Sequence, residues 1–116
     1  MRKNNCLFTI IILLVYQSFV FSQVLRETRA VWLSTNYRLD WPPATYNQET
    51  QKKELIKIFD DLKAKNFNTI YFQVRFNGTV LYKSDIEPMS YYITGTTGDE
   101  TAYDLLDFAI KEARLR

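Results

Sequence analysis

The spacing of apolar residues changes twice along the chain, and this alternation limits the folds that the chain can adopt. Two short runs rich in β-forming residues, RAVWLS (29–34) and TIYFQVR (69–75), predict buried strands. Between them, residues 48–65 are expected to form an amphipathic helix, because apolar side chains recur at helical spacing at Leu55, Ile58, Phe59 and Leu62. Strand, helix and strand in this order indicate a βαβ unit with parallel strands.

The ends of the predicted helices carry residues suited to capping. Asn47 is a suitable N-cap for the first helix, and Asn66 suits a left-handed position after its last turn. Phe67 then provides the hydrophobic contact that closes such a cap. A second helix is expected from about Asp104, with Asp107 in its first turn.

Two parallel strands cannot cover both of their edges and faces with the helices available here. We therefore expect an α/β fold that is the N-terminal portion of a larger (β/α) domain, truncated after its second helix. The alternative is a complete small α/β protein, which would have little core to stabilise it without disulfides.

The N-terminus has the features of an export signal. Arg2 and Lys3 precede an apolar run over residues 6–15, and small residues stand at Val20 and Ser22. Cleavage is expected near Ser22–Gln23, which gives a signal peptide over residues 1–22, a mature domain over 23–116, and a secreted or periplasmic protein. The alternative is a membrane anchor, but the apolar run is too short to span a bilayer. No stable membrane anchor is expected after cleavage.

Composition excludes several classes of function. The chain has 15 basic and 13 acidic residues, and Arg2 and Lys3 lie in the predicted signal, so the mature part is neutral. Bulk charge therefore gives no reason to expect nucleic-acid binding. The chain has no histidine, and its one cysteine, Cys6, lies in the predicted signal. We expect no metal site and no cofactor.

The two strand-to-helix connections are long and carry the residue types that bind sugars. Aromatic rings stack on the apolar face of a sugar while amides, carboxylates and guanidinium groups bond its hydroxyls. The first connection holds Asn36, Tyr37, Arg38, Asp40 and Trp41; the second holds Arg75, Asn77, Tyr82, Asp85, Glu87, Tyr91 and Tyr92. The alternative is ordinary loop packing.

Gln73 and Arg75 alternate along the second predicted strand and should share a face. In a barrel they would point inward near its open end, so Arg75 would either form a structural ion pair or position a substrate. No pair of carboxyl groups in the chain is a convincing catalytic pair for glycoside hydrolysis. Asn77-Gly78-Thr79 matches a glycosylation sequon, but a turn is the simpler interpretation.

Several stretches together resemble the glycosyl-hydrolase-like family 10 domain, a bacterial exported (β/α)-barrel family. The resemblance covers about residues 26–116. It rests on WLST (32–35) at the end of the first strand, on LDWP (39–42), and on QVR (73–75) leading to LY (81–82).

The resemblance implies a TIM-type (β/α)8 barrel, of which this chain supplies strand, helix, strand and helix. It also implies a secreted or periplasmic protein that acts on polysaccharide, with peptidoglycan glycan strands a plausible substrate. Its catalytic carboxyl groups would lie outside these 116 residues. The residues implied to bind or position the glycan are Trp32, Asn36, Asp40, Trp41, Gln73 and Arg75. The alternatives are a non-catalytic glycan-binding module on the same barrel and a non-functional truncated product.

Overall fold

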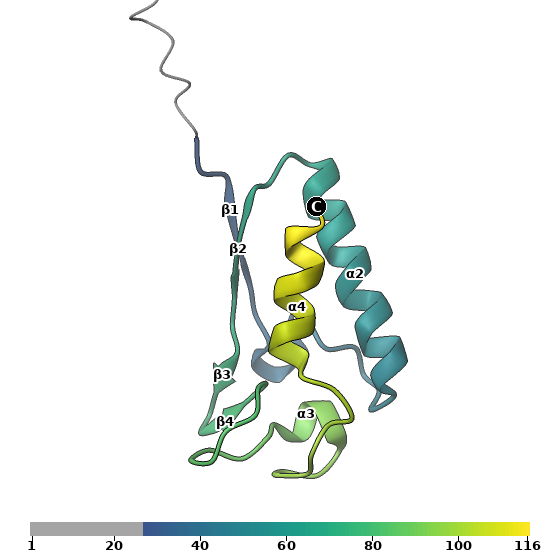
Figure 1. The fold of residues 1–116 in the computed structure, drawn as a ribbon, viewed down its shortest axis with the longest axis vertical. Coiled ribbons are helices and arrows are strands. Elements are labelled where there is room, and N and C mark those ends of the chain that lie inside the picture. Colours follow the sequence, from purple (N-terminus) through teal and green to yellow (C-terminus); the bar gives the residue numbers. More distant parts are fainter. Residues whose placement is uncertain (1–26) are drawn as a thin grey trace, which may run out of the picture.

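The computed structural model describes residues 27–116 as a small mixed α/β unit (Figure 1). The predicted signal peptide, residues 1–22, lies outside the described residues. Within residues 27–116, no helix is both long and apolar enough to cross a membrane. The elements follow the chain as β1 (Ala30–Leu33), the 3₁₀ helix η1 (Asn36–Arg38), α2 (Gln48–Ala64), β2 (Thr69–Phe72), β3 (Arg75–Phe76), β4 (Thr79–Val80), α3 (Tyr91–Thr94) and α4 (Leu105–Arg114).

The predicted βαβ unit is confirmed. Strands β1 and β2 pair in parallel, from Ala30 beside Thr69 to Leu33 beside Phe72, and α2 connects them. Because neighbouring residues of a strand point to opposite faces, this register separates the side chains into two sets. Leu33 and Phe72 face the helices and contribute to the core, whereas the opposite face is open.

The open face of the sheet carries two large aromatic rings. Trp32 is 62% exposed and Tyr71 is 55% exposed. They are neighbours in the β1–β2 register, and their rings stack with centroids 6.5 Å apart. The two helices lie side by side on the other side of the strands (Figure 1). In the described part of the chain, nothing therefore covers this face.

Both ends of α2 follow the sequence prediction. The Asn47 side chain accepts a hydrogen bond from the Thr50 backbone N–H at 2.8 Å. At the other end Asn66 has a left-handed backbone (φ 62°), and the Phe67 N–H donates to the Leu62 carbonyl at 3.0 Å. These contacts satisfy backbone groups that a helix leaves unpaired at its ends. The first strand is shorter than predicted, and α2 ends one residue earlier, at Ala64.

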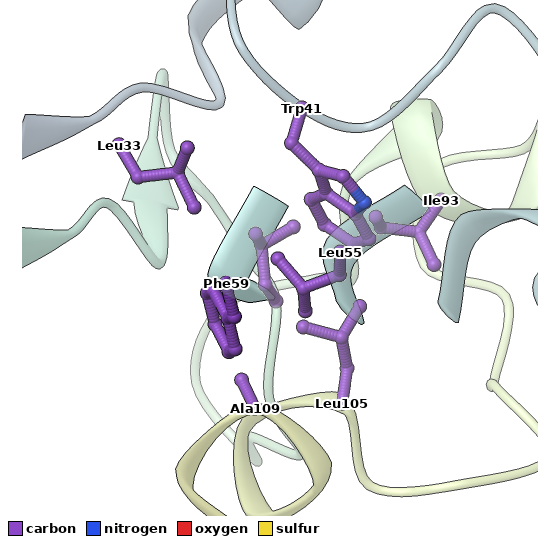
Figure 2. Close-up of a cluster of buried hydrophobic side chains, with 8 residues drawn as sticks. Leu33, Trp41, Leu55, Phe59, Ile93, Leu105 and Ala109 are labelled. Carbon is purple, nitrogen blue, oxygen red and sulfur yellow. The ribbon is translucent and has the colours of Figure 1, made fainter. Parts of the chain in front are cut away.

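Helix α4 begins after its predicted N-cap. The Asp104 carboxylate accepts a hydrogen bond from the Asp107 N–H at 2.9 Å. The buried core joins the sheet, the first connection and the helices (Figure 2), and it is formed by Leu33, Trp41, Leu55, Phe59, Leu81, Ile93, Leu105 and Ala109. This core fixes the ends of the strands relative to the two long connections.

The second connection departs from the sequence prediction. Strand β2 ends at Phe72 rather than Arg75, because the chain turns at residues 73–74 and enters the β3–β4 hairpin. Asn77 (φ 52°) and Gly78 (φ 72°) form its two-residue turn, both in the left-handed region. Asn-Gly is the preferred pair for such a turn. Residues 77–79 were predicted as a turn, but the two-residue strands on either side gave no separate sequence signal. The short helix α3 was also not predicted.

Candidate functional site

Gln73 organises the point where β1 ends. Its side-chain carbonyl oxygen, Oε1, accepts hydrogen bonds from the Ser34 hydroxyl and the Thr35 N–H, both at 3.0 Å, and from the Asn36 N–H at 3.2 Å. The Gln73 N–H also donates to the Leu33 carbonyl at 3.0 Å. Because only an oxygen can accept from backbone N–H groups, this network fixes the orientation of the amide.

The other half of the Gln73 amide stays open. Its Nε2 group makes no hydrogen bond to residues 27–116, and it is not one of the buried, unpartnered atoms of this region. The side chain is half-buried, so the two N–H donors face accessible space. Gln73 therefore holds the turn with its oxygen and presents donors with its nitrogen.

Asp40 closes the same turn from the other side. Its Oδ2 accepts the Ser34 N–H at 2.7 Å, while the Asp40 N–H donates to the Ser34 carbonyl at 3.2 Å. Asp40 is exposed, and one oxygen remains to accept a further bond. Asn36 lies between these residues, and its side-chain oxygen is buried without a partner among the described residues.

The turn itself is strained. Tyr37 (φ 49°) and Arg38 (φ 61°) are consecutive residues with left-handed backbones, although neither is glycine. Such conformations persist only where the surroundings enforce them, and they concentrate at functional sites. Here the bonds from Gln73 and Asp40 on either side provide that constraint.

The remaining predicted residues lie apart from this turn. Trp41 is 1% exposed, with its indole N–H donating to the Gln51 carbonyl at 3.0 Å and its ring edge-on to Phe72. Figure 2 shows the ring inside the core. Trp41 therefore supports the first connection from beneath, and the structure gives it no accessible surface for a ligand. Trp32 lies on the open sheet face, within β1 and before the turn.

Arg75 forms an ion pair on the hairpin. Its Nε donates to a Glu87 carboxylate oxygen at 2.7 Å, and Nη2 donates to the other oxygen. The hydrogen bond from Arg75 holds the pKa of Glu87 below its usual value, and Glu87 raises the pKa of Arg75. Glu87 is thus a stable carboxylate, which is the opposite of the protonated carboxyl group that a glycosidase acid requires.

Three of the six predicted residues, Asn36, Asp40 and Gln73, are therefore brought together at the strand ends, while Trp32, Trp41 and Arg75 are not. Sequence reasoning did not single out Ser34, which connects the three through its backbone and hydroxyl groups. Within residues 27–116, no group of three or more carboxylates is placed to hold a metal ion.

Comparison with known proteins identifies similar sequences. A family model described as Glycosyl hydrolase-like 10 matches residues 27–116. Glycosyl hydrolase DigH of Escherichia coli strain K12 is 38% identical over 96 residues, covering 76% of this chain and 22% of that protein. Glycosyl hydrolase YngK of Bacillus subtilis strain 168 is 36% identical over 92 residues, covering 78% of this chain and 18% of that protein. The chain spans about a fifth of the length of these curated relatives.

Proposed function

Because the chain belongs to the glycosyl hydrolase-like 10 family, we propose that it forms the opening part of an exported (β/α)8 barrel that binds and hydrolyses polysaccharide. In such barrels the substrate lies at the C-terminal ends of the strands. Peptidoglycan glycan strands are the substrate we propose. Residues 1–22 would direct export, with the mature protein beginning at Gln23.

The shape of the βαβ unit supports a barrel. The helices cover one face of the β1–β2 pair, and Trp32 and Tyr71 occupy the other. In a (β/α)8 barrel the face opposite the helices is the interior, which large side chains fill. Ser34 follows Trp32 by two residues, and Gln73 follows Tyr71 by two residues. The alternation of side chains along each strand would therefore direct both inward at the open end of the barrel.

The observation that carries the proposed site is the Gln73 network. It places amide donors of Gln73, a free carboxylate oxygen of Asp40 and the side chain of Asn36 around one turn at the strand ends. Sugar hydroxyls need both donors and acceptors, and this turn supplies both. These residues would bind and orient the glycan, while the carboxyl groups that transfer protons would come from later strands.

The test uses the full-length protein that the gene encodes and purified peptidoglycan glycan strands. We expect binding in calorimetry and release of new reducing ends. Gln73→Glu keeps the oxygen acceptors of the turn but removes the amide donors. We expect it to weaken binding by about threefold to tenfold, the value of one hydrogen bond.

Asn68→Asp is the matched control, because it makes the same amide-to-acid change at the start of β2, where Asn68 bonds Arg29 and Glu27. It should bind glycan as the wild type does. Unchanged binding by Gln73→Glu would remove the site assignment. Binding without any new reducing ends would favour a non-catalytic glycan-binding module, and absence of binding would refute the proposed function.

A further inference from the structure

A second group of side chains lies next to the β1 turn, and we call Arg38, Tyr46, Tyr91 and Tyr92 the tyrosine–arginine cluster. The Arg38 guanidinium carbon lies 4.8 Å from the centroid of the Tyr46 ring and 5.4 Å from that of Tyr92. Tyr46 meets Tyr91 edge to face at 5.5 Å. The cluster therefore joins the first connection to α3 in the second.

Buried contacts hold this cluster in place. The fully buried Gln51 side chain donates to the Thr45 carbonyl at 2.8 Å and to the Ile93 carbonyl at 3.1 Å. These carbonyls adjoin the two segments that carry the tyrosines. Gly95, with a left-handed backbone, lies against the Tyr46 ring, where an added Cβ would be only 3.3 Å from ring atoms. The rings are thus positioned by the protein before any ligand binds.

The surface of the cluster suits a sugar ring. Tyr46 is 42% exposed and Tyr91 is 47% exposed. The hydrogen bond with Tyr46 raises the pKa of Tyr91, so the Tyr91 phenol is neutral near pH 7. Neutral, partly exposed aromatic rings can stack on the C–H face of a sugar and bond its hydroxyls.

Among residues 27–116, Arg38 contacts two tyrosine rings but no carboxylate. Arg29, Arg75 and Arg116 each form an ion pair with a carboxylate, whereas Arg38 and Arg114 form none within the described part of the chain. Of these two, Arg114 is exposed and Arg38 is half-buried. The Nη2 of Arg38 donates to the Tyr92 carbonyl at 3.2 Å, and its Nε is buried without a partner among residues 27–116. A partly desolvated guanidinium lacking a counter-ion is best matched by an anion with two oxygens.

We propose that the tyrosine–arginine cluster is a subsite for a sugar residue that carries a carboxylate. The inference rests on the proposed function and extends it to the chemistry of one subsite. Tyr46 and Tyr91 contact the sugar ring, and Arg38 binds the carboxylate. This subsite lies beside the Gln73 turn, so one glycan chain can occupy both.

The experiment measures binding of the full-length protein to two forms of one ligand. The probes are oligosaccharides of alternating N-acetylglucosamine and N-acetylmuramic acid with free lactyl carboxylates, and the same oligosaccharides after reduction of those carboxylates to alcohols. We expect the wild type to bind the carboxylated form about tenfold more tightly at low salt, with a smaller preference at high salt. Arg38→Gln should lose this preference and keep its affinity for the reduced form.

Arg114→Gln is the matched control, because Arg114 is an exposed arginine at the end of α4, and its preference should equal that of the wild type. If Arg38→Gln does not fold, Arg38→Lys provides the test of the proposal. It keeps the charge but loses the planar fork, so the preference should fall several-fold. An unchanged preference in either variant would overturn the proposal, as would equal binding of both forms by the wild type. Failure of the wild type to bind either form would instead refute the proposed function.

Discussion

Gln73→Leu should destabilise the β1 turn, and the hydrogen bonds that it removes determine the loss in free energy of unfolding. The substitution removes the acceptor for the Thr35 and Asn36 N–H groups and for the Ser34 hydroxyl, and Ser34 and Thr35 are buried. The hydroxyl can rotate to another acceptor, and the Asn36 N–H also donates to the Ser34 hydroxyl oxygen at 3.3 Å, which leaves the Thr35 N–H as the one donor without its partner. A buried donor without a partner costs about 1–3 kcal/mol, and leucine fills a similar volume, so we expect a loss of about 1–3 kcal/mol.

The assay is urea unfolding of the full-length protein, together with hydrogen exchange of a peptide spanning residues 34–38. Gln73→Leu should shift the unfolding midpoint to lower urea and speed exchange at Thr35 and Asn36. Gln73→Glu retains the accepting oxygens and should remain within about 1 kcal/mol of the wild type. A loss below about 0.5 kcal/mol for Gln73→Leu, with unchanged exchange, would refute the view that Gln73 holds the turn.

Three further predictions concern the core and the titrating groups. Trp41→Ala should lower the free energy of unfolding in urea by about 3–5 kcal/mol, because the ring is buried. Ile86→Ala, at a position 93% exposed, is the control and should change it by less than about 0.5 kcal/mol. Equal effects would contradict the core position of Trp41. Arg75 lowers the pKa of Glu87, so the hairpin ion pair should persist above the usual carboxyl value of 4.5 and be lost as the pH falls through the lowered value. Hydrogen exchange in residues 75–80, corrected for intrinsic rates, should then rise in acid, and Glu87→Gln should abolish this dependence. Burial raises the pKa of Tyr103 to about 12, so ultraviolet titration should show a late phenol step that Tyr103→Phe removes, and stability should fall as the pH rises between about 10 and 12.

The parts of the fold that local sequence determines were predictable. Asn47, Asn66 and Asp104 cap helices through bonds to residues within a few positions, so the residue types alone located the helix ends. The two apolar runs also identified the parallel strands. The β3–β4 hairpin was missed because its strands are two residues long, which is too short for an alternating pattern to appear.

The site was only partly predictable, because its contacts depend on how distant segments align. Gln73 was selected as a polar residue near a strand end, but its role follows from the register that brings it beside Ser34. Trp41 and the tyrosines all looked like loop aromatics. Only tertiary packing separates Trp41, which fills the core, from Tyr46 and Tyr91, which keep about half of their surface.

Gln73 and Gln51 hold the two connections with different atoms of the side-chain amide, the oxygen in Gln73 and the nitrogen in Gln51. This difference indicates which of the two glutamines can contact a ligand. Gln73 uses its oxygen to hold the β1 turn, and its Nε2 stays accessible. Gln51 uses Nε2 to hold carbonyls of both connections, and its oxygen is buried without a partner among residues 27–116. A ligand can reach the free half of Gln73 but not that of Gln51. Replacing Gln51 should therefore alter glycan binding only through the positions of Tyr46 and Tyr91, whereas replacing Gln73 should alter a direct contact.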